Sequence, residues 1–254
     1  MSDAATIWAT SLLAVGVASA IPLFATWWLA SRPATTATWV PRLIFIAAGA
    51  LLGAAVFHLI PEALDDASPG RVALLVALGV LSLALMERVI HALERPHAGA
   101  GHEAHGHPSH LMPLGIASDA LHNTIDGALV ATAFLTNPSL GIFAGAAIAL
   151  HELPRELGTF ALCVEGGMTP RRAILVNAAT GVLALLGAVT ALLIGADAER
   201  FGVLLVPFAA GNFLYLSAAI LQASRGKAAG DRRVQNYALV LAGVLVTALL
   251  AGGH

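Results

Sequence analysis

The chain has 254 residues, of which 58% are hydrophobic and only 11% are charged, and its mean hydropathy is +0.82. Soluble domains carry about 25% charged residues, so this composition excludes an ordinary soluble protein and indicates a polytopic membrane protein embedded in a lipid bilayer. The formal net charge of −2 gives no reason to expect nucleic acid as a partner. One cysteine, Cys163, excludes an intrachain disulfide and a thiolate metal cage.

Eight apolar segments are long enough to cross the hydrocarbon core of a bilayer, which takes roughly 20 helical residues. They are predicted at 6–30, 40–63, 72–94, 112–135, 139–163, 170–195, 201–223 and 234–251. The N-terminus lacks the basic region and cleavage site of a signal peptide, so the first segment is predicted to remain as a span. The expected fold is an all-α bundle of eight transmembrane helices, forming one transmembrane domain over residues 1–254.

Lysine and arginine are distributed unevenly over the loops. Ten of the 13 lie in or beside the loops after the first, third, fifth and seventh segments, against two on the other face. Because positive residues favour the cytoplasmic side, both termini are predicted to be extracytoplasmic, and the expected location is a plasma membrane. The loop at about 95–111 is then cytoplasmic. Its five histidines leave two interpretations open, a flexible connector and a weak metal buffer.

The fourth segment contains polar side chains that are costly in lipid. On a helix His122 and Asp126 stand at i and i+4 on one face, Asp119 falls on the same stripe, and Asn123 lies one step round. Ionisable residues within a span usually face a cavity or a pathway. This stretch is therefore a candidate half of an intramembrane site.

The fifth segment supplies a second pair of the same ligand types, His151 and Glu152. A very short turn near residues 136–139 predicts that the two segments are antiparallel neighbours, so that their polar residues face each other. Imidazole and carboxylate ligands suit Zn²⁺, and also Cd²⁺, Fe²⁺ and Mn²⁺. A site without sulfur also suits an ion that must be released again.

Shortly after His151 and Glu152, the fifth segment carries three further residues that could affect the site. Pro154 is predicted to kink the helix beside the ligands, and a helix broken there would turn free carbonyls toward a cavity. Arg155 points into the same region, where it could repel a second divalent ion or compensate Glu152 or Asp126. Glu156 is a further candidate pathway residue.

The second segment carries a smaller signal of the same kind. His58 and Glu62 are again at i and i+4, near the predicted outward end of the segment. Two interpretations are equally open, an entrance or relay for the ion and a helix end exposed to solvent.

These motifs resemble those of the ZIP (Zrt/Irt-like protein) family of divalent metal transporters, in particular a bacterial member. Residues 118–127, SDALHNTIDG, are similar to the family's HNxxDG signature, and the stretch from His151, HELPRELGTF, to its HEIPHELGDF branch. The resemblance implies an eight-helix bundle with both termini outside that moves divalent metal into the cytoplasm, commonly as a homodimer. It implies His122, Asp126 and His151 as ligands, with Asn123 and Glu152 beside them.

Two acidic positions of the family's binuclear site are missing from this chain. Arg155 stands where binuclear members carry a bridging glutamate, and the neighbourhood of Ala184 is apolar where they carry another. We therefore expect a single-ion transport site, with the Arg155 guanidinium where a second ion would lie.

The sequence thus predicts a transporter of divalent metal, zinc first, that works by alternating access without covalent chemistry or a cofactor. The alternative from another class is a membrane-embedded zinc-dependent hydrolase built from Ser118, Asp119, His122 and His151. Against the hydrolase, the chain has no HExxH motif. A metal sensor without flux is a third interpretation.

Overall fold

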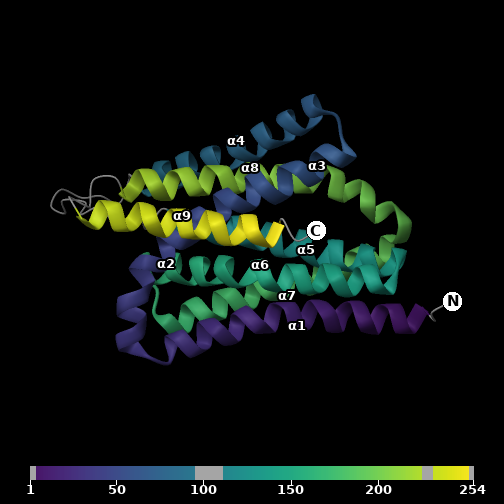
Figure 1. Cartoon of the computed structure of the whole chain (residues 1–254), viewed down its shortest axis with the longest axis horizontal. Coiled ribbons are helices and arrows are strands. Elements are labelled where there is room, and N and C mark those ends of the chain that lie inside the picture. Colours follow the sequence, from purple (N-terminus) through teal and green to yellow (C-terminus); the bar gives the residue numbers. More distant parts are fainter. Residues whose placement is uncertain (1–3, 95–110, 225–230, 252–254) are drawn as a thin grey trace.

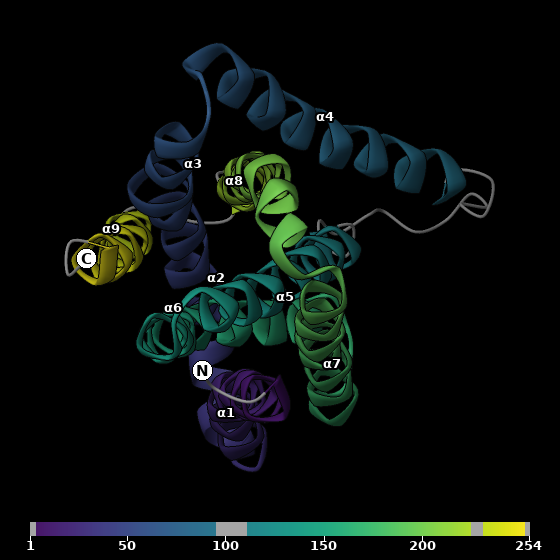
Figure 2. The ribbon, with the colours of Figure 1, turned by 90° about the vertical axis from the view of Figure 1, so that its right-hand side faces the viewer.

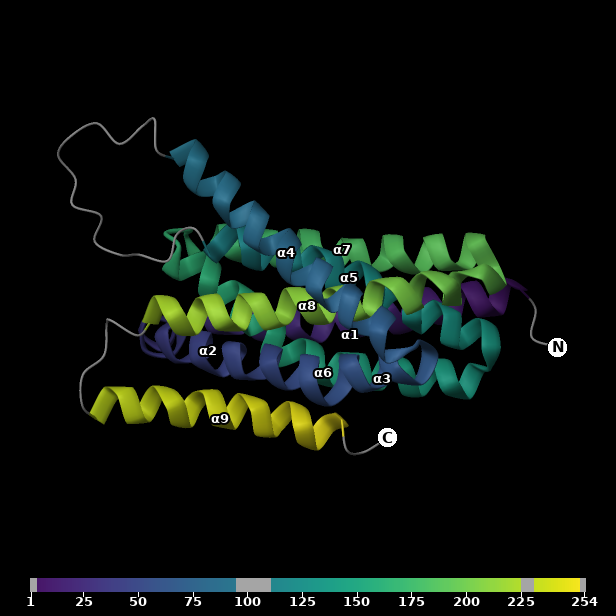
Figure 3. The same ribbon diagram turned by 90° about the horizontal axis from the view of Figure 1, so that it is seen from above.

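The computed structural model describes residues 4–94, 111–224 and 231–251, and all regular structure within them is helical. Long helices run roughly parallel or antiparallel along the molecule, with α4 tilted across one flank (Figures 1 and 3). The helices are α1 (Ala4–Ala30), α2 (Pro33–Ala54), α3 (Ile60–Asp66), α4 (Pro69–Glu94), α5 (Leu111–Thr136), α6 (Pro138–Glu165), α7 (Pro170–Ile194), α8 (Ala198–Ser224) and α9 (Asp231–Ala251), with a π-helical turn η1 (Ala55–Leu59) and a 3-10 turn η3 (Gly195–Asp197).

Each of the eight predicted segments coincides with a helix, and the second comprises α2, η1 and α3 in continuous succession. Among the described residues, five helical segments are long and apolar enough to cross a membrane. These are Ala4–Ala30, Pro33–Asp66, Pro69–Ala92, Pro170–Ile194 and Gly202–Ala223. Helices α5 and α6 carry the charged motifs, and the apolar part of α9 is shorter, Arg233–Leu249. The all-helical membrane fold is therefore confirmed, while eight crossings and the sides of the termini stay predictions.

The outer surface of the bundle is apolar. Large hydrophobic side chains such as Leu13, Phe143, Leu193 and Leu249 are 68%, 69%, 73% and 77% exposed. A large exposed apolar surface is favourable in lipid and unfavourable in water. The helices also satisfy their own backbone hydrogen bonds, as a lipid environment requires. The chain is accordingly a multi-pass membrane protein. The predicted histidine-rich loop at 95–111 lies, except for Leu111, outside the described residues.

Helix α5 lies inside the bundle, packed chiefly against α7 and α6 and also against α8 and α1, while α2 pairs with α9 and α4 with α8 (Figure 2). The contact between α5 and α7 is close enough to exclude side chains. A Cβ atom on Gly127 would lie 1.8 Å from the carbonyl oxygen of Ala184, and one on Gly187 would lie 2.0 Å from that of Thr124. Reciprocal glycines therefore bring the two backbones together beside the polar motif of α5.

The irregular backbone lies in the second predicted segment, whereas the sequence suggested the fifth. Helix α6 runs without interruption from Pro138 to Glu165 with Pro154 inside it, so the helix is not broken there, and the kink expected at Pro154 stays a prediction. The second segment instead widens to a π-helical turn at Ala55–Leu59, where the amide of Ile60 donates to the carbonyl of Ala55. The wide turn precedes Pro61, which has no amide hydrogen to continue the α-helical pattern.

Candidate metal site

A tight hairpin places the two polar motifs opposite each other. Helix α5 ends at Thr136 and α6 begins at Pro138, so that Asn137 alone separates them. Asn137 caps α6, because its side-chain oxygen accepts a hydrogen bond from the amide of Ser139 at 2.8 Å, and Pro138 occupies the first helical turn. The predicted short turn and antiparallel neighbours are thereby confirmed.

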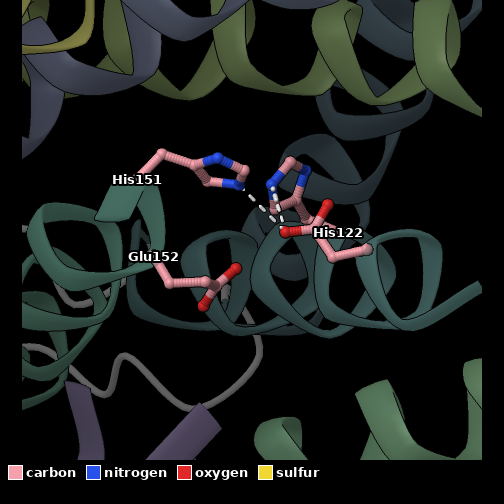
Figure 4. Close-up of side chains that lie close together, drawn as sticks. His122, His151 and Glu152 are labelled. Atoms are coloured by element: carbon pink, nitrogen blue, oxygen red, sulfur yellow. Dashed lines mark hydrogen bonds and ion pairs between the residues drawn. The ribbon is translucent and has the colours of Figure 1, made fainter. Parts of the chain in front are cut away.

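Four of the predicted ligands converge. Asp126 Oδ2 lies 3.2 Å from His122 Nε2 and 3.0 Å from His151 Nε2. One ligand atom from each of His122, Asp126, His151 and Glu152 can be chosen so that all lie within 4.8 Å of one another. Figure 4 shows the two imidazoles turned toward the same carboxylate, with Glu152 on the His151 side. Two nitrogens and two carboxylate oxygens are the ligand types of the four-coordinate N/O sites that zinc occupies.

The imidazole of His122 is buried without a hydrogen bond. Neither of its ring nitrogens has a hydrogen-bond partner among the described residues, since the 3.2 Å contact with Asp126 lacks hydrogen-bond geometry. The ring of Phe213, from α8, lies against it with centroids 4.6 Å apart. A buried polar atom without a partner is unfavourable, and a metal ion would satisfy a nitrogen left in this state.

The side-chain amide of Asn123 contacts a different group of side chains. Its amide Nδ2 donates to Glu156 Oε1 at 3.1 Å and to Asp119 Oδ2 at 3.3 Å. The structure thus places Asn123 next to the four-residue cluster, where it lines a pocket with Asp126 and Glu152, but engages its amide group with two other carboxylates.

Arg155 lies at the centre of that neighbouring group. Its Nη1 donates to Asp119 Oδ1 and its Nη2 to Glu152 Oε1, while Glu156 Oε1 lies 3.7 Å from Nη2. All four side chains are at most 5% exposed. The sequence expectation that Arg155 compensates Glu152 or Asp126 is thus met by Glu152, and the second close partner is Asp119 instead. The hydroxyl of Thr159 also donates to Asp119 Oδ1, at 3.1 Å.

Ala184, near which the resemblance to the family would place a further glutamate, lies beside the carboxylates. It lines the same pocket as Asn123, Asp126 and Glu152, together with residues of α1, and is 3% exposed. The position is therefore adjacent to the carboxylates, and its methyl group supplies no ligand there.

His58 and Glu62 lie at the edge of the site. Their side chains are 37% and 38% exposed, and His58 Nε2 is 3.8 Å from Glu62 Oε2. The ring of His58 also lies 5.8 Å from that of His151, which in turn is 5.7 Å from that of His122. The pair is thus partly exposed and next to the buried cluster, and both interpretations, an entrance and an exposed helix end, stay open.

Three contributors escaped the sequence analysis. Asn177 of α7 donates from Nδ2 to the carbonyl of Glu156 at 2.9 Å, and its own Oδ1 is buried without a partner among the described residues. Thr159 and Phe213 contact Asp119 and His122, as described above. Asn177 could have been found, because an amide within an apolar segment is itself a signal. Thr159 lies within the stretch HELPRELGTF, where the HEIPHELGDF branch has aspartate, but the sequence did not predict its contact with Asp119 or that of Phe213 with His122.

Comparison with known proteins gives consistent matches. The sequence model of the ZIP zinc transporter family matches residues 113–251. The chain is 40% identical over 102 residues to the zinc transporter ZIP6 of Homo sapiens, which covers 40% of this chain but 14% of that protein. It is 26% identical over 267 residues to the zinc transporter zipt-7.1 of Caenorhabditis briggsae, covering 83% of this chain and 68% of the relative. It is 28% identical over 226 residues to ZIP13 of Pongo abelii, covering 83% and 66%.

Proposed function

The chain belongs to the ZIP zinc transporter family, and on that premise we propose that it carries a divalent metal ion, zinc first, across the membrane into the cytoplasm. The observation that carries the proposal is the convergence of His122, Asp126, His151 and Glu152 inside a bundle of apolar helices. The names of the relatives support zinc as the ion, and the same ligand types leave Cd²⁺, Fe²⁺ and Mn²⁺ as further substrates.

The mechanism that fits this geometry is alternating access. An ion enters past His58 and Glu62, exchanges its water for the imidazoles of His151 and His122, and is neutralised by Asp126. The bundle then rearranges and opens the site toward the cytoplasm. The inward direction rests on the distribution of Lys and Arg over the loops, which makes both termini extracytoplasmic. We place the protein in a bacterial inner membrane and expect a homodimer.

The site is proposed to hold one ion. A second ion would have to lie among Asp119, Glu152 and Glu156, where the guanidinium of Arg155 already pairs with the first two and lies 3.7 Å from Glu156 Oε1. Ala184 offers no further ligand. Two cations in this buried group would repel each other strongly, because the interior screens charges weakly.

We expect one zinc ion per chain at saturation. Anomalous scattering from crystals grown with zinc, checked by metal analysis of the desalted protein, should show a single full-occupancy ion among His122, Asp126, His151 and Glu152. Two full-occupancy ions within this buried group would contradict the single-ion proposal.

Removing one ligand tests the transport site directly. His122→Ala should abolish zinc uptake into proteoliposomes. The substitution breaks no hydrogen bond among the described residues but leaves a cavity against Phe213, so the protein should fold with a lowered thermal midpoint. The measurement is the initial rate of ⁶⁵Zn uptake, with the thermal midpoint in detergent as the folding control. Thr190→Ala, on the exposed face of α7, is a matched alanine substitution away from the site and should retain uptake. Full uptake by His122→Ala would overturn the assignment.

The hydrolase alternative is less well supported by the same geometry. Asp119 accepts hydrogen bonds from Arg155, Thr159 and Asn123, so it is not a free base. Ser118 is buried with no hydrogen-bond partner among the described residues, hence without the activating base that a nucleophile needs. Vectorial zinc flux without turnover of lipid or peptide supports the transporter, and turnover without flux supports the enzyme.

A further inference from the structure

We propose that Arg155 is a tethered competitor for Glu152: the transported ion takes this carboxylate from the guanidinium, and its return to the guanidinium promotes release of the ion. This inference rests on the proposed transport function. It assigns to Arg155 a role in setting the affinity of the site, beyond filling the place of a second ion.

The first step is that one carboxylate belongs to both groups. Glu152 is a member of the four-residue metal cluster, and its Oε1 also accepts a hydrogen bond from Arg155 Nη2. Glu152 is 2% exposed and Arg155 5%, so bulk water takes little part in the exchange. A carboxylate already engaged by a guanidinium is a weaker ligand, and an ion arriving beside it meets a fixed positive charge. Ion binding and the Arg155–Glu152 pair therefore oppose each other.

The second step is that Arg155 has another acceptor within reach. Glu156 Oε1 lies 3.7 Å from the same Nη2 that holds Glu152. Glu156 Oε2 and Arg155 Nε are both buried without a hydrogen-bond partner among the described residues. The group thus has an unused acceptor and an unused donor, which a shift of the guanidinium toward Glu156 would bring together. Arg155 can therefore leave Glu152 without becoming a buried charge that has no partner.

The third step is that the guanidinium stays anchored during the exchange. Asp119 Oδ1 holds Nη1, and Thr159 donates to the same oxygen at 3.1 Å. Asp119 is in turn fixed by the amide of Asn123, which also holds Glu156 at 3.1 Å. The cation therefore pivots about Asp119 between Glu152 and Glu156. When the ion departs, the same cation lies ready to compensate Glu152, so the emptied site is not left with an unpaired buried carboxylate.

A double-mutant cycle tests the competition. Zinc affinity is measured by calorimetry in nanodiscs for the wild type, Arg155→Gln, Glu152→Gln and the double variant. Arg155→Gln should tighten zinc binding about tenfold where Glu152 is present and less than about twofold in the Glu152→Gln background. Arg155→Gln should also lower both KM and kcat for uptake, because the ion is held more firmly. Arg200→Gln removes an exposed arginine that pairs with Asp197 and is the matched control, expected to leave affinity unchanged.

An equal gain in zinc affinity in both backgrounds would show that Arg155 acts only through its charge. No gain in affinity in either background would show that Arg155 and the ion do not compete for Glu152. Either result overturns the inference while leaving the transport proposal intact, which His122→Ala tests separately.

Because Arg155→Gln leaves buried carboxylates without their cation and could fail to fold, the exchange is also measured in the wild-type protein. Zinc-induced infrared difference spectra should show changes in the guanidinium bands, and Glu152→Gln should abolish them. Unchanged guanidinium bands on zinc loading of the wild type would overturn the inference.

Discussion

Gly127→Ala should abolish zinc uptake and lower the free energy of unfolding by about 3 kcal/mol or more, the upper range for overpacking a core. The added Cβ would lie 1.8 Å from the carbonyl oxygen and 2.6 Å from the carbonyl carbon of Ala184. These are backbone atoms of a neighbouring helix and cannot rotate away, so α5 and α7 must separate. Gly127 directly follows Asp126, and the separation would displace a proposed ligand. The measurements are the thermal midpoint in detergent and ⁶⁵Zn uptake.

Gly181→Ala, on α7, is the matched control. Its added Cβ would meet only the Cβ of Ser19 at 3.6 Å, an ordinary van der Waals contact. The substitution should leave uptake unchanged and the unfolding free energy within about 1 kcal/mol of the wild type, with any change toward greater stability, because alanine favours the helix over glycine. A wild-type thermal midpoint for Gly127→Ala would contradict the close contact between α5 and α7.

The pairing of the two motifs could be predicted from sequence because local rules decide it. The i and i+4 spacing puts His122 and Asp126 on one helix face, and the Asn137–Pro138 turn leaves α6 no place except beside α5. Helix boundaries were predictable for the same reason, since the apolar segments end at prolines, glycines and charges. These signals lie within a few residues of what they determine.

The partners across the bundle could not be predicted in the same way. Periodicity places Asp119 on the stripe of His122, but it does not say that the stripe turns from the histidines toward Arg155 and Thr159 of α6. That depends on the rotation and register of α5 relative to α6, which no short sequence pattern specifies. Likewise, Pro61 and Pro154 are equal sequence signals for irregular backbone, yet of the two only Pro61 is preceded by a π-helical turn.

Asp119 and Asp126 lie on the same helix but have different partners, so their replacement should lower stability by different amounts. Asp119→Asn should lower the free energy of unfolding by about 3 kcal/mol, because it removes the charge that holds Nη1 of the buried Arg155. Asp126→Asn should cost less than about 1 kcal/mol, because its contacts are with two imidazoles rather than with a permanent cation. Both substitutions are nearly isosteric, so differences in packing do not confound the comparison. Thermal midpoints of the two purified variants measure the contrast.

Zinc binding should rank the same two variants in the reverse order. Asp126→Asn removes a carboxylate at the centre of the metal cluster and should weaken zinc binding about 100-fold or more, the upper end of the loss seen even for residues that only support a ligand. Asp119→Asn, where it folds, should change affinity less, since Asp119 acts on the ion only through Arg155 and Asn123. Calorimetry on both proteins decides the matter. Equal losses of affinity would place Asp119 among the ligands and contradict its role as the anchor of Arg155.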